Sequence, residues 1–134
     1  MSPPASPALS VEDALRAYAR MMNTLSADPL EPHLADDFHY ESQWVFSGIT
    51  SKQEFLDYIR PKLATIKESG FRVWAEMAEM GAYPKGPCLV LAEGEQQKLV
   101  ATLLLKVAGG KIQRADLCLI PHPEAARRSG EYPT

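Results

Sequence analysis

The sequence has few cysteines and no long apolar run, and both shortages narrow the class of protein. Its 134 residues include only two cysteines, Cys88 and Cys118, which lack the spacing of a redox or zinc motif. No apolar stretch approaches the roughly 18 residues of a membrane-spanning helix. Residues 1–7 contain neither the basic nor the apolar region of a secretory signal. We therefore expect a cytoplasmic protein with reduced, buried thiols and no membrane partner.

The sequence also contains fewer basic than acidic residues. The chain has 14 Lys and Arg against 17 Asp and Glu, a formal net charge of −3. Proteins that bind nucleic acid or an anionic membrane usually present a basic surface, so neither is an expected partner.

Several common catalytic motifs are missing. The three histidines show no metal-ligand spacing and no acidic cluster accompanies them, so we predict no metal and no other cofactor. The chain has no glycine-rich phosphate loop before a helix and no Gly-x-Ser-x-Gly nucleophile motif. The sequence alone therefore assigns no reaction.

What is present suits one soluble domain: 46% of the residues are hydrophobic and 23% are charged. Six of the eleven prolines lie near the two ends. We expect a flexible N-terminal tail over residues 1–8, a single domain over residues 9–120, and a C-terminal tail over residues 121–134.

The first half of the chain carries helix signals around one strand. Ser10 can cap a helix that starts beside it, and Ser51 can cap a later one that ends near Gly70. Pro61 lies inside the second pattern and predicts a kink. Between them, a short helix is expected over residues 30–34 and an alternating strand over residues 37–42, continued by a short strand or turn near residues 44–46.

The second half reads as antiparallel strands, over residues 71–80, 87–93, 98–108 and 111–120. Gly109-Gly110 predicts a two-residue hairpin, because both positions of a type I′ turn need a positive φ. Helices followed by a run of strands indicate an α+β fold with the helices on one face of the sheet.

This order of elements, together with Leu34-Ala-Asp-Asp-Phe-His-Tyr-Glu-Ser42, the run from Gly48 to Phe55 and Gly110-Lys-Ile-Gln-Arg114, resembles the nuclear transport factor 2-like superfamily. The superfamily includes SnoaL-like cyclases, ketosteroid isomerases and scytalone dehydratase. The resemblance covers residues 9–120 and implies an α+β cone, in which helices pack in the concave face of a curved, mostly antiparallel sheet and enclose a pocket.

The resemblance also implies a homodimer through the outer face of the sheet. It places the strands of Cys88 and Cys118 on either side of a third strand, a separation too large for a disulfide.

For the site, the resemblance aligns Ser42 with the carboxylate base of the steroid isomerases. A serine hydroxyl is not a general base near neutral pH. Tyr18 lies roughly where those enzymes have an oxyanion-stabilising tyrosine, or it is simply a core residue.

Pocket-lining candidates come from strand alternation and from the aromatic residues. Tyr40 and Ser42 share a strand face with Phe38, so both hydroxyls line a pocket if Phe38 faces inward. The full set of ligand-binding candidates is Tyr18, Tyr40, Ser42, Trp44, Tyr58, Trp74, Leu117 and Leu119. The alternative is that the aromatic residues form only the core of a small domain.

Two pairs of charged residues can each be interpreted in two ways. His39 and Glu41 face away from Tyr40, either as an acid–base couple or as a polar outer surface. Strand alternation puts Ile112, Arg114, Asp116 and Cys118 on one face and Ala115, Leu117 and Leu119 on the other. The superfamily resemblance implies that the second set faces inward, so Arg114 and Asp116 are expected outside, where they form ion pairs within or between subunits, unless a bulge turns them into the pocket.

We therefore expect a homodimeric small-molecule-binding domain with an apolar pocket for a small organic ligand. One alternative is a SnoaL-like isomerase, cyclase or dehydratase that uses His39, Tyr40 or Asp116 for acid–base chemistry on a cyclic or carbonyl substrate. The other is a non-catalytic dimerisation or assembly domain.

Overall fold

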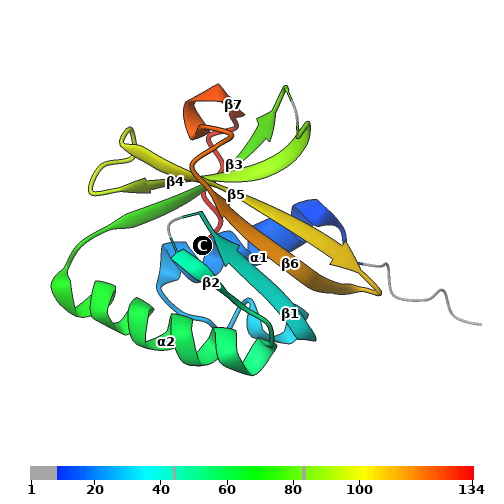
Figure 1. The fold of residues 1–134 in the computed structure, drawn as a ribbon. Helices are drawn as coiled ribbons and strands as arrows, with labels where there is room; N and C mark the ends of the chain where they lie inside the picture. Colours follow the sequence, from blue (N-terminus) through cyan, green and yellow to red (C-terminus); the bar gives the residue numbers. More distant parts are fainter. Residues whose placement is uncertain (1–8, 44, 83) are drawn as a thin grey trace, which may run out of the picture.

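A single curled sheet carries the fold, and two α-helices lie against it (Figure 1). The computed structural model describes residues 9–43, 45–82 and 84–134. Within these residues the elements are α1 (Val11–Thr24), η1 (Glu31–His33), β1 (Leu34–Ser42), β2 (Val45–Ile49), α2 (Lys52–Ser69), β3 (Val73–Met80), β4 (Gly86–Glu93), β5 (Leu99–Ala108), β6 (Lys111–Cys118), η2 (Pro123–Ala125) and β7 (Ala126–Arg128).

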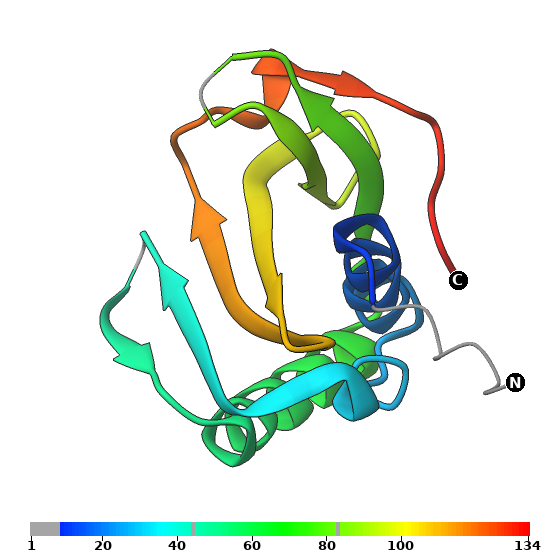
Figure 2. The same cartoon turned by 90° about the vertical axis from the view of Figure 1, so that its right-hand side faces the viewer.

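The strands follow the order β2-β1-β6-β5-β4-β3-β7. Neighbours run antiparallel except β1 and β6, which are parallel. The sheet curls around α1, and α2 lies against β1 (Figure 2). The expected α+β architecture is confirmed, with helices in the concave face of a mostly antiparallel sheet.

Both helices begin at the predicted caps. The Ser10 hydroxyl accepts a hydrogen bond from the Asp13 N–H at 3.0 Å, and the Ser51 hydroxyl accepts one from the Glu54 N–H at 3.1 Å. Helix α2 ends at Gly70, whose φ of 73° suits a residue without a Cβ. The helix continues through Pro61, and the kink there stays a prediction.

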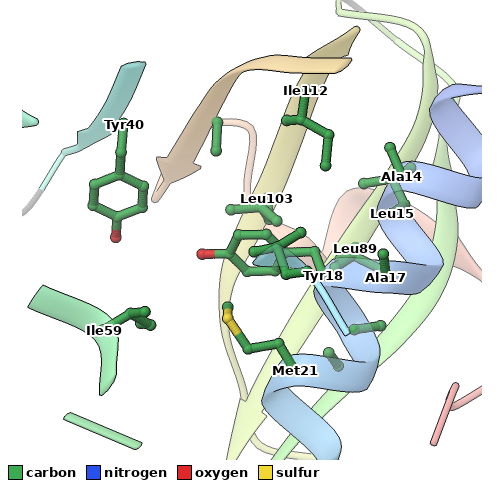
Figure 3. Close-up of a cluster of buried hydrophobic side chains, with 14 of the residues drawn as sticks. Ala14, Leu15, Ala17, Tyr18, Met21, Tyr40, Ile59, Leu89, Leu103 and Ile112 are labelled. Carbon is green, nitrogen blue, oxygen red and sulfur yellow. The ribbon is translucent and has the colours of Figure 1, made fainter. Parts of the chain in front are cut away.

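The core lies between the two helices and the concave face of the sheet. Phe55 of α2 is fully buried, with its ring centroid 5.0 Å from that of Phe38, 5.3 Å from Tyr40 and 6.5 Å from Tyr18. Figure 3 shows Tyr18 and Tyr40 reaching toward the same space from α1 and from β1. The alternation predicted for residues 37–42 therefore holds, because Phe38, Tyr40 and Ser42 are all buried.

Some element boundaries differ from expectation. Residues 30–34 contain only the 3₁₀ turn η1, and β1 begins at Leu34 rather than at residue 37. Strand β6 ends at Cys118, two residues early. The Gln43 side chain accepts hydrogen bonds from the N–H groups of Leu119 and Ile120 at 2.6 and 3.0 Å, which takes these residues out of the strand ladder.

The prediction that residues 121–134 form a tail outside the domain is wrong. Strand β7 pairs with β3 through Ala78 and Arg128, and beyond it the Met77 N–H donates to the Glu131 carbonyl at 2.9 Å. This segment covers the backbone groups along the open edge of β3, which a sheet edge otherwise exposes. The proposed N-terminal tail, residues 1–8, lies outside the described residues.

A bulge corrects the predicted face of one residue. Lys106 of β5 pairs with Arg114, whereas the next residue, Val107, pairs with Ile112, so Gln113 is the extra residue. Ile112 is therefore fully buried on the same face as Ala115. The expectation that it shares the outer face with Arg114 is wrong, because alternation fails at a bulge.

The cysteine prediction is confirmed. Cys88 lies on β4 and Cys118 on β6, the two strands that flank β5, and both are buried free thiols. Neither α-helix of the described chain is long and apolar enough to cross a membrane.

Candidate functional site

A small cavity lies between the two helices and the concave face of the sheet. Its volume is about 60 Å³. Aliphatic side chains from α1, α2 and four strands form most of its wall, among them Met22, Ile59, Leu63, Leu91, Val100 and Leu117. The charged residues of its lining are Lys62 and Glu93, both exposed. The cavity is thus an apolar chamber with charge only at its mouth.

Two tyrosines provide hydroxyl groups to the cavity. Tyr18 and Tyr40 are 3% and 5% exposed, and both line it. In Figure 3 their hydroxyl groups point into the space between α1, α2 and β1. Burial raises the pKa of Tyr18 well above the ordinary value, and burial together with Tyr58 raises the pKa of Tyr40. Both phenols therefore stay neutral and can donate hydrogen bonds.

Tyr40 connects the cavity to its mouth through a chain of polar groups. The side chains of Tyr58 and Ser42 lie close enough to its phenol to influence its pKa. The Tyr40 and Tyr58 ring centroids are 5.9 Å apart. The Lys62 ammonium in turn donates to the Tyr58 hydroxyl at 3.2 Å. Tyr58 thus lies between the cation and the buried phenol, hydrogen-bonded to Lys62 and in ring contact with Tyr40.

The structure brings together only part of the predicted ligand-binding set. Tyr18, Tyr40 and Leu117 line the cavity, and Ser42 and Tyr58 contact Tyr40. The prediction for Trp44 falls outside the described residues.

Two members of that set lie elsewhere, which corrects their assignment. Val73 lines the cavity, so the next residue of β3, Trp74, points to the opposite face, where the Arg72 guanidinium lies 5.0 Å from its ring centroid. Leu119 follows the end of β6 and is 37% exposed. It no longer follows the strand alternation that would turn it inward.

The charged pairs lie on the outer face. His39 pairs with Arg114 and Glu41 with Asp116 across β1 and β6, while Tyr40 pairs with Ala115 on the inner side. His39 Nε2 lies 2.7 Å from Glu41 Oε1, and this hydrogen bond lowers the pKa of the Glu41 carboxyl.

On β6, Arg114 donates through two nitrogens to Asp116, at 2.9 Å each. The idea that His39 and Asp116 perform acid–base chemistry inside the cone is therefore wrong. Of the weak catalytic candidates, only Tyr40 lines the cavity. Among the described residues, no three His, Cys, Asp or Glu side chains gather as metal ligands would.

Comparisons with known proteins inform the fold. No family model and no curated protein matches the sequence. A SnoaL-like protein of unknown function from Burkholderia thailandensis is similar in structure, with a TM-score of 0.60, 14% identity, and coverage of 92% of this chain and 100% of that one. An NTF2-like protein of unknown function from Cytophaga hutchinsonii has a TM-score of 0.59 and 15% identity, covering 90% and 98%. The chain has the nuclear transport factor 2-like fold.

A third protein with this fold is a proposed polyketide cyclase from Sinorhizobium meliloti, with a TM-score of 0.54, 13% identity, and coverage of 79% of this chain and 94% of that one. At such identities the likeness establishes the architecture and leaves the chemistry to the site itself. The superfamily resemblance inferred from the sequence is confirmed at the level of the fold.

Within the nuclear transport factor 2-like fold, the sequence prediction missed Lys62 and the mouth of the cavity. Ile59, Leu63 and Ile66 recur at three- and four-residue steps, the spacing of an inward-facing helix stripe, and Lys62 lies next to that stripe. A cation that borders an apolar helix face was the available signal. Glu93 could not be found this way, because only the pairing of β3, β4 and β5 places it near α2.

Proposed function

We propose that this chain binds a small organic molecule with an acceptor oxygen on an apolar body, in the cavity between α1, α2 and the sheet. The Tyr18 hydroxyl carries this proposal. Tyr18 is only 3% exposed, its hydroxyl faces the cavity, and no hydrogen bond joins this hydroxyl to a described residue. The apolar wall offers this donor no acceptor, so a ligand oxygen that accepts from it gains binding free energy.

The residues that line the cavity support a ligand-binding role better than a role as an isomerase, cyclase or dehydratase. Proton abstraction needs a base that is ionised near neutral pH. The described lining has no imidazole, and its carboxylate, Glu93, is exposed at the mouth. The superfamily resemblance aligns Ser42, and not a carboxylate, with the base of the steroid isomerases. The two neutral phenols can orient a carbonyl group but cannot remove a proton from carbon.

The cavity volume limits the size of the ligand. Typical sites for drug-sized ligands have volumes of about 300–1,000 Å³, whereas this cavity has about 60 Å³. We therefore propose a ligand of few heavy atoms, with any larger part at the mouth. A completely filled cone would have favoured the assembly-domain alternative.

The test compares a ketone with its hydrocarbon. Cyclopentanone and cyclopentane are titrated into the 15N-labelled chain, and amide shifts are followed for the wild type, Tyr18→Phe and the control Tyr132→Phe, which lies outside the cavity. We expect the ketone to bind more tightly, and Tyr18→Phe to weaken it about fivefold without affecting the hydrocarbon. Equal binding of ketone and hydrocarbon in the wild type, or no effect of Tyr18→Phe, would refute the proposal.

We also propose that two copies of the chain pair through the outer face of β1, β6 and β5. The register aligns Arg114 and Lys106 in a cationic row across β6 and β5, next to an anionic row of Glu41 and Asp116 across β1 and β6. A two-fold axis that lies between the two faces, parallel to these rows and midway between them, places the cationic row of each copy over the anionic row of the other. The surface is thus complementary to itself.

Sedimentation velocity tests the pairing. Arg114→Glu should give a monomer, because it puts like charges together across the axis. The exchange variant with Arg114→Asp and Asp116→Arg restores one charge of each sign and should recover the dimer. A monomeric wild type would contradict the proposal. We place the protein in the cytoplasm, where Cys88 and Cys118 remain reduced.

A further inference from the structure

We infer that the ligand is a short oxo carboxylate, with its carboxylate at Lys62 and its ketone oxygen at the buried tyrosines. The inference rests on the proposed function and narrows it to one chemical class. Its basis is the combination of a cation at the cavity mouth, donors inside the cavity, and the short polar path between them.

Lys62 is available to an anion at the mouth. It lines the cavity, and its ammonium lies 5.5 Å from the centroid of the Tyr58 ring while donating to the hydroxyl of that residue. No described carboxylate lies within salt-bridge distance of it, whereas Arg60 on the same helix pairs with Glu31 at 2.8 Å. An ammonium has three donors, so two remain for a ligand carboxylate.

The distance between cation and phenol selects the length of the ligand. Lys62 donates to the Tyr58 hydroxyl at 3.2 Å, and the Tyr58 ring centroid lies 5.9 Å from that of Tyr40. Lys62 and Tyr40 both line the cavity, so a single tyrosine side chain separates the cation from the inner phenol. The carboxylate and the ketone of a 4-oxo acid are separated by two methylene groups, a similarly short span. Its methylene groups would lie against the aliphatic wall.

Glu93 places a negative charge opposite in sign to Lys62 at the same cavity mouth. It lines the cavity as Lys62 does, and it forms no ion pair with any described residue. A ligand carboxylate at this mouth is attracted by Lys62 and repelled by Glu93. Neutralising the two residues one at a time must therefore shift the affinity of an anion in opposite directions.

The experiment titrates the full chain with levulinate (4-oxopentanoate), its neutral amide and pentanoate, by calorimetry at pH 7 and low salt. We expect levulinate to bind about fivefold more tightly than its amide, the upper range for one exposed ion pair. Lys62→Gln should abolish this preference, and Glu93→Gln should increase it. Lys67→Gln, an exposed position on the same helix outside the cavity, should leave it unchanged.

The three probes separate the two proposals. If levulinate and its amide bind equally, or if Lys62→Gln preserves the preference, the oxo carboxylate assignment is wrong while ketone binding stands. If levulinate binds no better than pentanoate, the hydrogen bond to the ketone fails, and the proposed function fails with it. Absence of binding by all three probes overturns both.

Discussion

The Asn23 side chain on α1 pairs with the backbone of Ala75 on β3 as a neighbouring strand would. Its Oδ1 accepts from the Ala75 N–H at 2.7 Å, and its Nδ2 donates to the Ala75 carbonyl at 2.9 Å. The same Nδ2 donates to the Pro133 carbonyl at 2.7 Å. One amide thus joins the first helix, the sheet edge and the C-terminal segment.

Replacing this amide should destabilise the whole domain. Asn23→Ala removes three hydrogen bonds and leaves the backbone groups of Ala75 without partners, so we expect a loss of about 3 kcal/mol in the free energy of unfolding. Urea denaturation followed by circular dichroism measures it. The control is Thr24→Ala, an exposed neighbour expected to change stability by less than about 0.5 kcal/mol. Similar effects of both substitutions would contradict the role of Asn23.

A buried ion pair fastens the C-terminal segment to the sheet. Glu76 is only 3% exposed and accepts from Arg128 Nε at 2.7 Å and from the Gly130 N–H at 2.8 Å. Removing one partner of a buried pair is costly, so Glu76→Gln should lower stability by about 3 kcal/mol. It should also accelerate amide exchange in β7 and the residues after it.

The control for that pair is its exposed neighbour. Glu79 accepts from Arg127 at 2.8 Å, but both side chains are largely in solvent. Glu79→Gln should change the free energy of unfolding by less than about 0.5 kcal/mol. If Glu76→Gln proves equally mild in denaturant titrations, burial of the carboxylate does not stabilise the segment.

The β5–β6 hairpin requires glycine for its backbone conformation and not for lack of space. Gly109 and Gly110 have φ values of 61° and 76°, and a Cβ at either would meet no atom within 4 Å. Gly109→Ala should therefore cost about 1–2 kcal/mol through backbone strain alone. Gly81 is equally open and lacks a positive φ, so Gly81→Ala should not destabilise. Thermal unfolding of both variants distinguishes strain from crowding.

The Cys88 thiol should be unreactive in the native state. Burial, and secondarily Glu79, raise its pKa to about 11. The thiolate is the nucleophile, so modification by a disulfide reagent should be slow at pH 8 and should accelerate as the pH rises toward 11. Urea should remove the protection. With Cys118→Ser as background, absorbance of the released thiol reports Cys88 alone; labelling at the unfolded rate at pH 8 would disprove the burial argument.

The accuracy of sequence prediction depended on how local each signal was. The caps at Ser10 and Ser51 and the Gly109-Gly110 turn act within a few residues, so they could be identified before any tertiary structure. The aromatic character of Trp74 suggested the cavity, but the phase of β3 turns it outward. The type of a residue does not show which face of a strand its side chain occupies.

The inner tyrosines could be predicted in part. Tyr40 follows from alternation with Phe38, and Tyr18 from the superfamily resemblance. The bulge at Gln113 and the strand 126–128 had no comparable signal. Their hydrogen-bond partners lie on other strands, and for β7 about 50 residues away along the chain.

The sequence by itself determined the helix ends, the hairpin, the reduced thiols and the α+β class, because each depends on residue type and short-range spacing. Only the tertiary structure decided which charged groups face the cavity. The register of β1 against β6 puts His39 and Asp116 outside, and the packing of α2 brings Lys62 to the mouth. That choice depends on strand phase and helix placement, which are set by contacts between residues distant in the chain.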